Sequence, residues 1–163
     1  MEGLELRRLE RGDFDKGFLQ LMQQLTVVGD VSREMFDAKM QQLEKLGDYH
    51  RIVVIEDVKS GRVVATGSIF IEHKFARSCG KVGHLEDVVV DERMRGCHLG
   101  QRYLYFALSI FAQQSQRRVI EALTSFAKDA GCYKVILDCK PENAAFYEKC
   151  GYSKKEIQMA KYF

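Results

Sequence analysis

The chain has 163 residues, of which 46% are hydrophobic and 29% are charged. These values are typical of globular proteins, so they exclude bulk disorder and predict a single folded domain over residues 1–163. A net charge of +2 is too small for generic binding to nucleic acid or to an anionic membrane surface. The longest uncharged apolar run, residues 103–112, is shorter than the ~20 residues of a membrane span.

The cysteines indicate neither a disulfide framework nor a metal site. Their number is odd, no two have CxxC spacing, and none stands beside a histidine in a metal-ligand pattern; they are Cys79, Cys97, Cys132, Cys139 and Cys150. Free thiols predict a reducing, cytoplasmic location. Residues 1–5 are acidic at two positions and lack the apolar run of a signal peptide.

The first third of the chain predicts one strand and two helices. Residues 4–9 alternate between apolar and charged side chains, as in a half-buried strand. Asp13 is a predicted N-cap for a helix whose apolar residues, from Phe18 to Leu25, follow helical spacing. Ser32 is a second predicted N-cap, for a helix that ends at Gly47.

The remaining elements complete a mixed α/β order. Residues 51–56 and 63–71 predict a hairpin, and residues 83–90 predict a third strand. A basic, glycine-containing loop then precedes a long helical region. A strand at residues 135–139, a short helix at 143–150 and a last strand at 157–163 follow. The pattern indicates a central sheet flanked by helices.

The segment over residues 87–101 carries the strongest chemical signal. A buried strand leads into a basic loop in which Gly96 and Gly100 permit close approach of a ligand to the backbone. The loop opens a helix, whose N–H groups and dipole would suit a pyrophosphate. Taken alone, the pattern is equally compatible with a surface turn next to a helix cap.

The sequence of this loop, RGCHLG at residues 95–100, resembles the acyl-CoA pyrophosphate loop of the GNAT family of N-acetyltransferases. Residues 25–29, 83–90, 131–139 and 143–152 are similar to the eukaryotic glucosamine 6-phosphate N-acetyltransferases within that family. The resemblance implies the GNAT fold, with a mixed, mostly antiparallel sheet. It also implies direct acetyl transfer from acetyl-CoA to the 2-amino group of glucosamine 6-phosphate, for UDP-N-acetylglucosamine synthesis. The alternatives are a catalytically impaired homologue that binds acetyl-CoA, and an acetyltransferase for another amine.

The resemblance also implies the donor site. The strand at Val88, Val89 and Val90 would pair with the pantetheine arm, and its N–H groups would hold the thioester oxygen. The pyrophosphate would be wrapped by Arg95, Gly96, Cys97, His98, Leu99, Gly100 and Gln101. Asn143 would hydrogen-bond the cofactor arm. One departure is His98, which stands at the family's central glycine position and requires a negative φ there.

The catalytic groups that the resemblance implies are Glu86, Asp138 and Tyr147. Glu86 and Asp87 would lie in the sugar site, although strand alternation sends them to opposite faces. Asp138 would orient or deprotonate the amine, and Tyr147 would protonate the departing thiolate. The structural alternatives are a solvated strand residue for Glu86, a turn residue for Asp138 and a core aromatic for Tyr147.

The sugar phosphate needs cations, and the resemblance places several basic residues near it. The implied acceptor-binding residues are Thr26, Lys74, Arg77, Tyr133, Lys134 and Lys161, in addition to the carboxylates. Lys161 lies in a C-terminal tail that, by resemblance, crosses to the partner of a homodimer. Two departures are Arg77 in place of a histidine and Tyr162 near the family's arginine position.

Residues 103–118 are extra relative to the single helix of the family. An unbroken helix over residues 99–130 would be about 48 Å long, and sixteen added residues would rotate its downstream face by about 160°. The apolar stripe from Ile120 to Ala127 would then face away from the sheet. We therefore expect a break near residues 113–116 or a rearranged segment. The apolar run at 103–112 fits burial, an interface or a membrane-facing patch.

Overall fold

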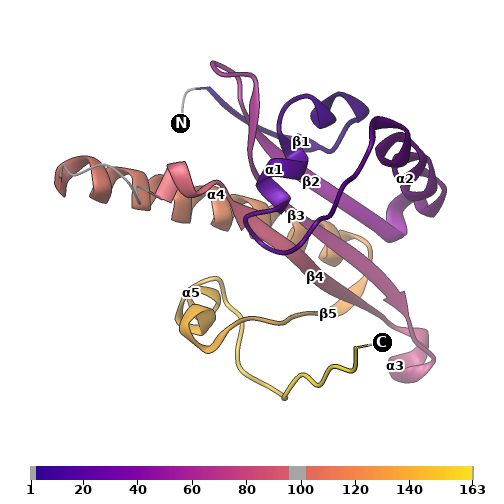
Figure 1. Cartoon of the computed structure of the whole chain (residues 1–163). Coiled ribbons are helices and arrows are strands. Elements are labelled where there is room, and N and C mark those ends of the chain that lie inside the picture. Colours follow the sequence, from indigo (N-terminus) through magenta and orange to yellow (C-terminus); the bar gives the residue numbers. More distant parts are fainter. Residues whose placement is uncertain (1–2, 96–101, 163) are drawn as a thin grey trace.

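The computed structural model describes residues 3–95 and 102–162, and the side chains of residues 95–109 lie outside that description. The elements in chain order are β1 (Leu4–Arg8), η1 (Arg11–Phe14), α1 (Phe18–Met22), α2 (Arg33–Leu46), η2 (Gly47–Tyr49), β2 (His50–Asp57), β3 (Arg62–His73), α3 (Ala76–Cys79), β4 (Lys81–Val90), η3 (Glu92–Arg95), α4 (Arg102–Asp129), β5 (Cys132–Leu137), η4 (Pro141–Asn143) and α5 (Ala144–Lys149). The strands form one sheet in the order β1-β2-β3-β4-β5, as Figure 1 shows. Neighbouring strands are antiparallel except β4 and β5, which are parallel. The mixed, mostly antiparallel sheet of the prediction is therefore confirmed.

Helices cover the two faces of the sheet (Figure 1). Under α4, Ile69 and Leu85 of the sheet pack with Ile120 and Leu123 of the helix. On the other face, a second cluster joins α1 and α2 to β2, β3 and β4; its members include Phe18, Leu21, Phe36, Met40, Val54, Val63 and Val89. Because successive strand residues point to opposite faces, the three central strands β2, β3 and β4 contribute to both clusters.

Asp13 does not begin a helix, so its predicted role as an N-cap is wrong. It lies fully buried in η1, where its carboxylate accepts a hydrogen bond from the backbone N–H of Glu10 (2.8 Å). The Arg7 guanidinium donates two further bonds to it, at 2.8 and 2.6 Å, and also bonds Glu56. The N-cap of α1 is Gly17, at φ 85°. A buried carboxylate needs such a charged partner, and the long-range pairing with Arg7 overrides the local capping pattern.

Helix α4 is continuous over 28 residues, so the expected break near residues 113–116 is wrong. Its C-terminal part keeps the apolar stripe on the sheet, with Val119, Ile120, Leu123 and Ala127 almost fully buried. The stripe therefore faces the sheet. The helix starts at Arg102, about 25 Å before Val119, and Figure 1 shows its first part projecting past the sheet.

The projecting part of α4 is only partly covered. Ile110 and Phe111 are about 40% exposed (39% and 41%). Among the residues that the structure describes, no helix has both the length and the apolar character needed to cross a membrane.

The C-terminal tail forms no strand over residues 157–162, so the predicted last strand is wrong there. Residues 153–162 run without helix or strand beside the sheet (Figure 1). Ile157, Met159 and Tyr162 are each 92% exposed. A strand exists only where a neighbouring strand pairs with it, and the described sheet ends at β5 without adding this segment.

The contact between β3 and α4 depends on Gly67. A Cβ atom at this position would lie 2.6 Å from Cγ1 of Val119 and 3.3 Å from Cδ1 of Leu123. We expect Gly67→Ala to lower the free energy of unfolding by about 1–3 kcal/mol through overpacking. Urea unfolding followed by circular dichroism measures this. Gly12→Ala is the matched control, because a Cβ there meets no described atom within 4 Å; equal losses in the two variants would contradict the proposed fit.

Candidate active site

A β-bulge at Asp87 shapes the centre of the site. Val89 of β4 pairs with Thr66 and Glu86 pairs with Ser68, so two residues of β4 oppose Gly67 alone. Asp87 takes up the extra length at φ 54°, in the left-handed region that aspartate tolerates better than most residues. The bulge interrupts the alternation that predicted opposite faces for Glu86 and Asp87, and both side chains are exposed.

The bulge lies where β4 separates from β5. The parallel pairing runs from Lys81 only to Leu85, which pairs with Leu137, whereas β4 continues to Val90. The stretch Val88–Val90 therefore extends past its last β5 partner. This is the stretch that the sequence assigned to the pantetheine arm, and an extended ligand could add there as a strand would.

Three carboxylates gather beside this gap. Burial raises the pKa of Glu86, and the charges of Asp138 and Asp87 raise it further. Asp138 follows the end of β5, and its Oδ2 accepts a hydrogen bond from Nε2 of Gln158 at 2.6 Å. Burial lowers the pKa of His50, whereas the charge of Asp87 opposes that shift. The structure thus brings together the three acidic residues that the sequence placed in the sugar site.

Tyr147 lies on the α4 side of the sheet. It is buried in the same cluster as Ala112 and Val119 of α4. Burial raises the pKa of its phenol, the nearby Cys139 thiol adds to the rise, and a hydrogen bond with Gln116 partly offsets it. A phenol with a raised pKa stays protonated at neutral pH, which a proton donor requires. The same burial also fits a core aromatic, so geometry alone leaves both roles open.

Glu86 and Tyr147 lie toward different faces of the sheet. Leu85 packs under α4, and Glu86, the next residue before the bulge, belongs to the opposite face. Asp138 follows the end of β5, near Glu86, and the next residue, Cys139, acts on the pKa of Tyr147. The gap beyond the Leu85–Leu137 pair is therefore the place where groups from the two faces can meet.

The basic residues form two groups near the β3–β4 hairpin. The guanidinium of Arg77 and the ammonium of Lys134 each lie 5.9 Å from the centre of the Tyr133 ring. The Nζ atom of Lys74 instead donates to Oε1 of Glu72 at 2.6 Å. The other carboxylate oxygen of Glu72 lies 2.8 Å from Nε2 of His84.

The structure leaves other predicted site residues apart from these groups or outside the described residues. Thr26 is exposed in the loop after α1, Asn143 is exposed at the end of η4, and Lys161 is exposed in the tail. The pyrophosphate-loop prediction falls on Gly96, Cys97, His98, Leu99, Gly100, Gln101 and the side chain of Arg95, which lie outside the described residues.

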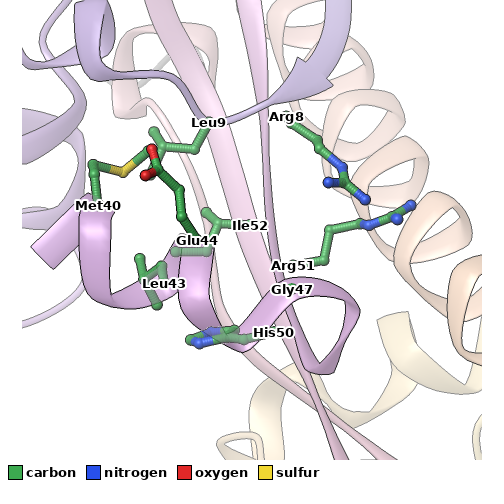
Figure 2. A pocket seen from close by; sticks show the side chains of 9 residues that line it. All are labelled: Arg8, Leu9, Met40, Leu43, Glu44, Gly47, His50, Arg51 and Ile52. Atoms are coloured by element: carbon green, nitrogen blue, oxygen red, sulfur yellow. The ribbon is translucent and has the colours of Figure 1, made fainter.

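A surface hollow of about 230 Å³ lies between α2 and the start of β2 (Figure 2). Its lining residues are Arg8, Leu9, Met40, Leu43, Glu44, Gly47, His50, Arg51 and Ile52, none of which was predicted for the site. Within residues 3–95 and 102–162, no three His, Cys, Asp or Glu side chains are grouped to hold a metal ion.

Sequence reasoning missed Glu72, His84 and Gln158. His84 stands two residues before Glu86 on the same strand, so alternation could have placed both on one face. The roles of Glu72 and Gln158 depend on contacts across the fold, for which the sequence holds no signal.

The comparisons agree with this geometry. The profile of the acetyltransferase (GNAT) family matches residues 6–152. A glucosamine 6-phosphate N-acetyltransferase of Arabidopsis thaliana is 50% identical over 162 residues, covering 99% of this chain and 98% of the relative. One from Dictyostelium discoideum is 40% identical, covering 99% and 92%. The crystal structure of the Arabidopsis enzyme superposes with a TM-score of 0.87 at 49% identity, covering 99% of each chain.

The proximity of Asp138 to Glu86 leads to a prediction that can be tested by titration. Asp138→Asn removes a negative charge that disfavours ionisation of Glu86, so the pKa of Glu86 moves downward. Carbon-13 NMR of glutamate-labelled protein measures the midpoint. Glu5→Gln, on the far edge strand β1, is the control and leaves it in place. An unchanged Glu86 midpoint in Asp138→Asn would show that the two carboxylates do not interact.

Proposed function

The chain belongs to the acetyltransferase (GNAT) family, and we propose that it transfers the acetyl group of acetyl-CoA to the 2-amino group of glucosamine 6-phosphate. The product is N-acetylglucosamine 6-phosphate, a precursor for UDP-N-acetylglucosamine synthesis. The observation that carries this proposal is 50% identity, over nearly the full length, to an enzyme of that name. The grouping of Glu86, Asp87 and Asp138 beside the β4–β5 gap supports it.

On the donor side, acetyl-CoA supplies an activated thioester carbonyl. The main chain of Val88–Val90, past the end of β5 pairing, is the stretch that would hold the pantetheine arm. Backbone N–H groups there would stabilise negative charge on the carbonyl oxygen. Residues 95–101 would hold the pyrophosphate, and Asn143 would hydrogen-bond the arm.

On the acceptor side, the amine must lose a proton as it attacks. Asp138 is the group that orients the amine and accepts its proton, and Glu86 and Asp87 hold the sugar. The Tyr147 phenol, kept protonated by its buried surroundings, donates to the departing sulfur. The amine attacks the thioester carbon directly, so the proposed transfer passes through no covalent enzyme intermediate.

We also propose a homodimer in which the tail, with Lys161, reaches the partner's site. The support is the exposure of Ile157 and Met159, at 92% each, in a segment that pairs with no described strand of its own chain. The described cysteines are free thiols, which suits the cytoplasm.

The decisive experiment follows release of free CoA from acetyl-CoA with the purified protein. We expect turnover with glucosamine 6-phosphate and much slower turnover with unphosphorylated glucosamine or other amines. Tyr147→Phe is expected to lower kcat by about 10²-fold or more, since it removes the proposed proton donor. Glu148→Gln, at the exposed next position of α5, is the matched control.

The results of this assay distinguish the proposed function from its alternatives. Binding of acetyl-CoA without turnover of any amine would support the impaired homologue instead. Faster turnover of another amine would reassign the acceptor. Equal rates with glucosamine and its 6-phosphate would contradict the roles proposed for Lys74, Arg77 and Lys134.

We further infer that residues 103–118 are an insertion that weakens the donor site. A helix N-terminus attracts phosphate through its N–H groups and its dipole, and both act only at short range. In this chain α4 begins at Arg102, about 25 Å of helix away from Val119, which sits on the sheet.

A variant that joins Arg102 directly to Val119 tests this inference. We expect it to bind CoA about tenfold more tightly by calorimetry, equivalent to about 1.4 kcal/mol. As a control, Gly67→Ala is introduced into the shortened chain. It lowers the free energy of unfolding there as in the full chain if Val119 of α4 still packs on Gly67. Equal or weaker CoA binding by a folded variant would show that the insertion does not impair the site.

A further inference from the structure

The end of β4 is held by a buried aspartate. Asp91 follows Val90 directly, and its backbone N–H donates to the carbonyl oxygen of Val64 at 2.8 Å, one step beyond the last β3–β4 pair, Ala65 and Val90. Its own carbonyl oxygen accepts from the N–H of Met94 at 2.9 Å, across the turn η3. The Asp91 side chain is only 4% exposed. Asp91 thus belongs both to the end of the sheet ladder and to the turn that leaves it.

The Asp91 carboxylate accepts hydrogen bonds from two segments of the chain. Arg93 donates to one oxygen through its backbone N–H at 2.9 Å and through Nε at 3.0 Å, and to the other oxygen through Nη2 at 2.5 Å. Gln24 bonds the same carboxylate. Burial raises the pKa of Asp91, but the bonds from Arg93 and Gln24 outweigh that effect, so the pKa is lowered. The group is therefore ionised at neutral pH and holds the backbone of the turn through its charge.

Gln24 ties this strand end to a segment that lies far away in the sequence. It follows α1, and its Oε1 accepts from the backbone N–H of Glu92 at 2.8 Å. Together with its bond to Asp91, Gln24 thus contacts two consecutive residues after β4. Met94, in the same turn, packs against the apolar cluster under α4, whereas α1 lies on the opposite face of the sheet. The exit from β4 is therefore attached to elements on both faces.

These contacts bear on the donor because they adjoin the stretch Val88–Val90. Beyond Leu85, β4 has no partner in β5, and the bulge at Asp87 bends the strand. The path of the stretch is therefore set by its pairing with β3, by the bulge at one end and by Asp91 at the other. An extended ligand pairs with a strand only where the backbone groups keep their spacing, and a misplacement of about 1 Å can cost about 10²-fold in rate.

We infer that Asp91 is a positioning residue for the donor: with Arg93 and Gln24 it fixes the end of β4, so that Val88–Val90 keep the path along which the pantetheine arm pairs. This inference rests on the proposed function and adds residues that act on the donor through the main chain. Asp91 acts through β4 and not by contact with a substrate. Its loss therefore weakens donor binding and leaves acceptor binding unchanged.

Calorimetric titration of Asp91→Asn with CoA and with glucosamine 6-phosphate tests this inference. The substitution keeps the size of the side chain and an oxygen for the N–H of Arg93, but it removes the charge that holds the guanidinium. We expect the Kd of CoA to rise about tenfold, because hydrogen bonds to a charged group are weakened. The Kd of glucosamine 6-phosphate stays that of the parent. A rise of both constants, or of neither, in a folded variant would overturn the inference.

Gln24→Ala is a second variant, which keeps the test decisive if Asp91→Asn does not fold. Gln24 is exposed, so its removal leaves the core intact. We expect the Kd of CoA to rise about fivefold, since hydrogen bonds to Asp91 and Glu92 are lost. Gln23→Ala, at the exposed preceding residue, is the matched control and leaves this Kd unchanged. CoA binding by Gln24→Ala equal to that of the parent would contradict the role of this attachment.

Pantetheine, which lacks the pyrophosphate and the nucleotide, shows which part of the donor is affected. Nitrogen-15 NMR titration follows the amide signals of Val88–Val90 in the parent and in Gln24→Ala. We expect the affinity for pantetheine to fall by the same factor as the affinity for CoA. A loss confined to CoA would place the effect on the pyrophosphate and overturn the inference. The absence of any response of these amides in the parent would overturn it too.

Equilibrium binding keeps this inference separate from the proposed reaction. A parent protein that binds CoA but does not turn over glucosamine 6-phosphate would refute the reaction, and the affinities of the variants would still decide the inference. Turnover by the parent together with unchanged CoA binding by both variants would refute the inference alone. Absence of CoA binding by the parent would refute both.

Discussion

The candidate site depends on the point where β4 leaves β5. Pairing stops at Leu85 and Leu137, and Asp87 bends β4 just beyond. Beyond Leu85 this edge of β4 has no pairing partner in β5, and an exposed strand edge normally invites association with other chains. Here the edge lies inside the fold, between a face covered by α4 and a face lined with acidic groups. The pantetheine arm of the donor would pair with Val88–Val90 where a further strand would otherwise lie. The separation of β4 from β5 would thus bind the donor and also let its thioester contact the acceptor.

The two faces give the acid and the base different surroundings. Tyr147 is buried among apolar side chains under α4, which favours its neutral form. Glu86 and Asp138 lie on the more open face, where they repel one another and keep a negative field beside the gap. The pKa values of both Tyr147 and Glu86 are therefore raised, the first by apolar burial and the second by burial and neighbouring like charges. Perturbed titratable groups on either side of one gap are typical of acid–base sites.

Features with a local cause could be predicted from the sequence. Ser32 caps α2 as expected, because its hydroxyl accepts from the N–H of Met35 only three residues away. The five strands of the sheet were also found near their predicted positions, since their apolar residues form the buried clusters, whereas the strand predicted at 157–163 was not found. Asp13 was misread because its charged partner is Arg7 of β1, whose guanidinium also binds Glu56 of β2. The bulge at Asp87 escaped prediction because alternation assumes a regular strand.

The contrast between local and long-range causes also explains why α4 is unbroken. Residues 102–129 contain no glycine or proline, so local propensity favours one unbroken helix. The expected break assumed that the whole helix must fit the sheet. In fact Val119, Ile120 and Leu123, nearly fully buried, fix its position together with the buried Ala112 and Ser115, and the residues before them follow as an extension. The local sequence thus decides whether the helix is continuous. The buried core residues decide which of its positions face the sheet. The buried positions from Ala112 to Ala127 therefore hold the helix on the sheet, whereas its start at Arg102 lies beyond them, and helical propensity alone carries the helix that far.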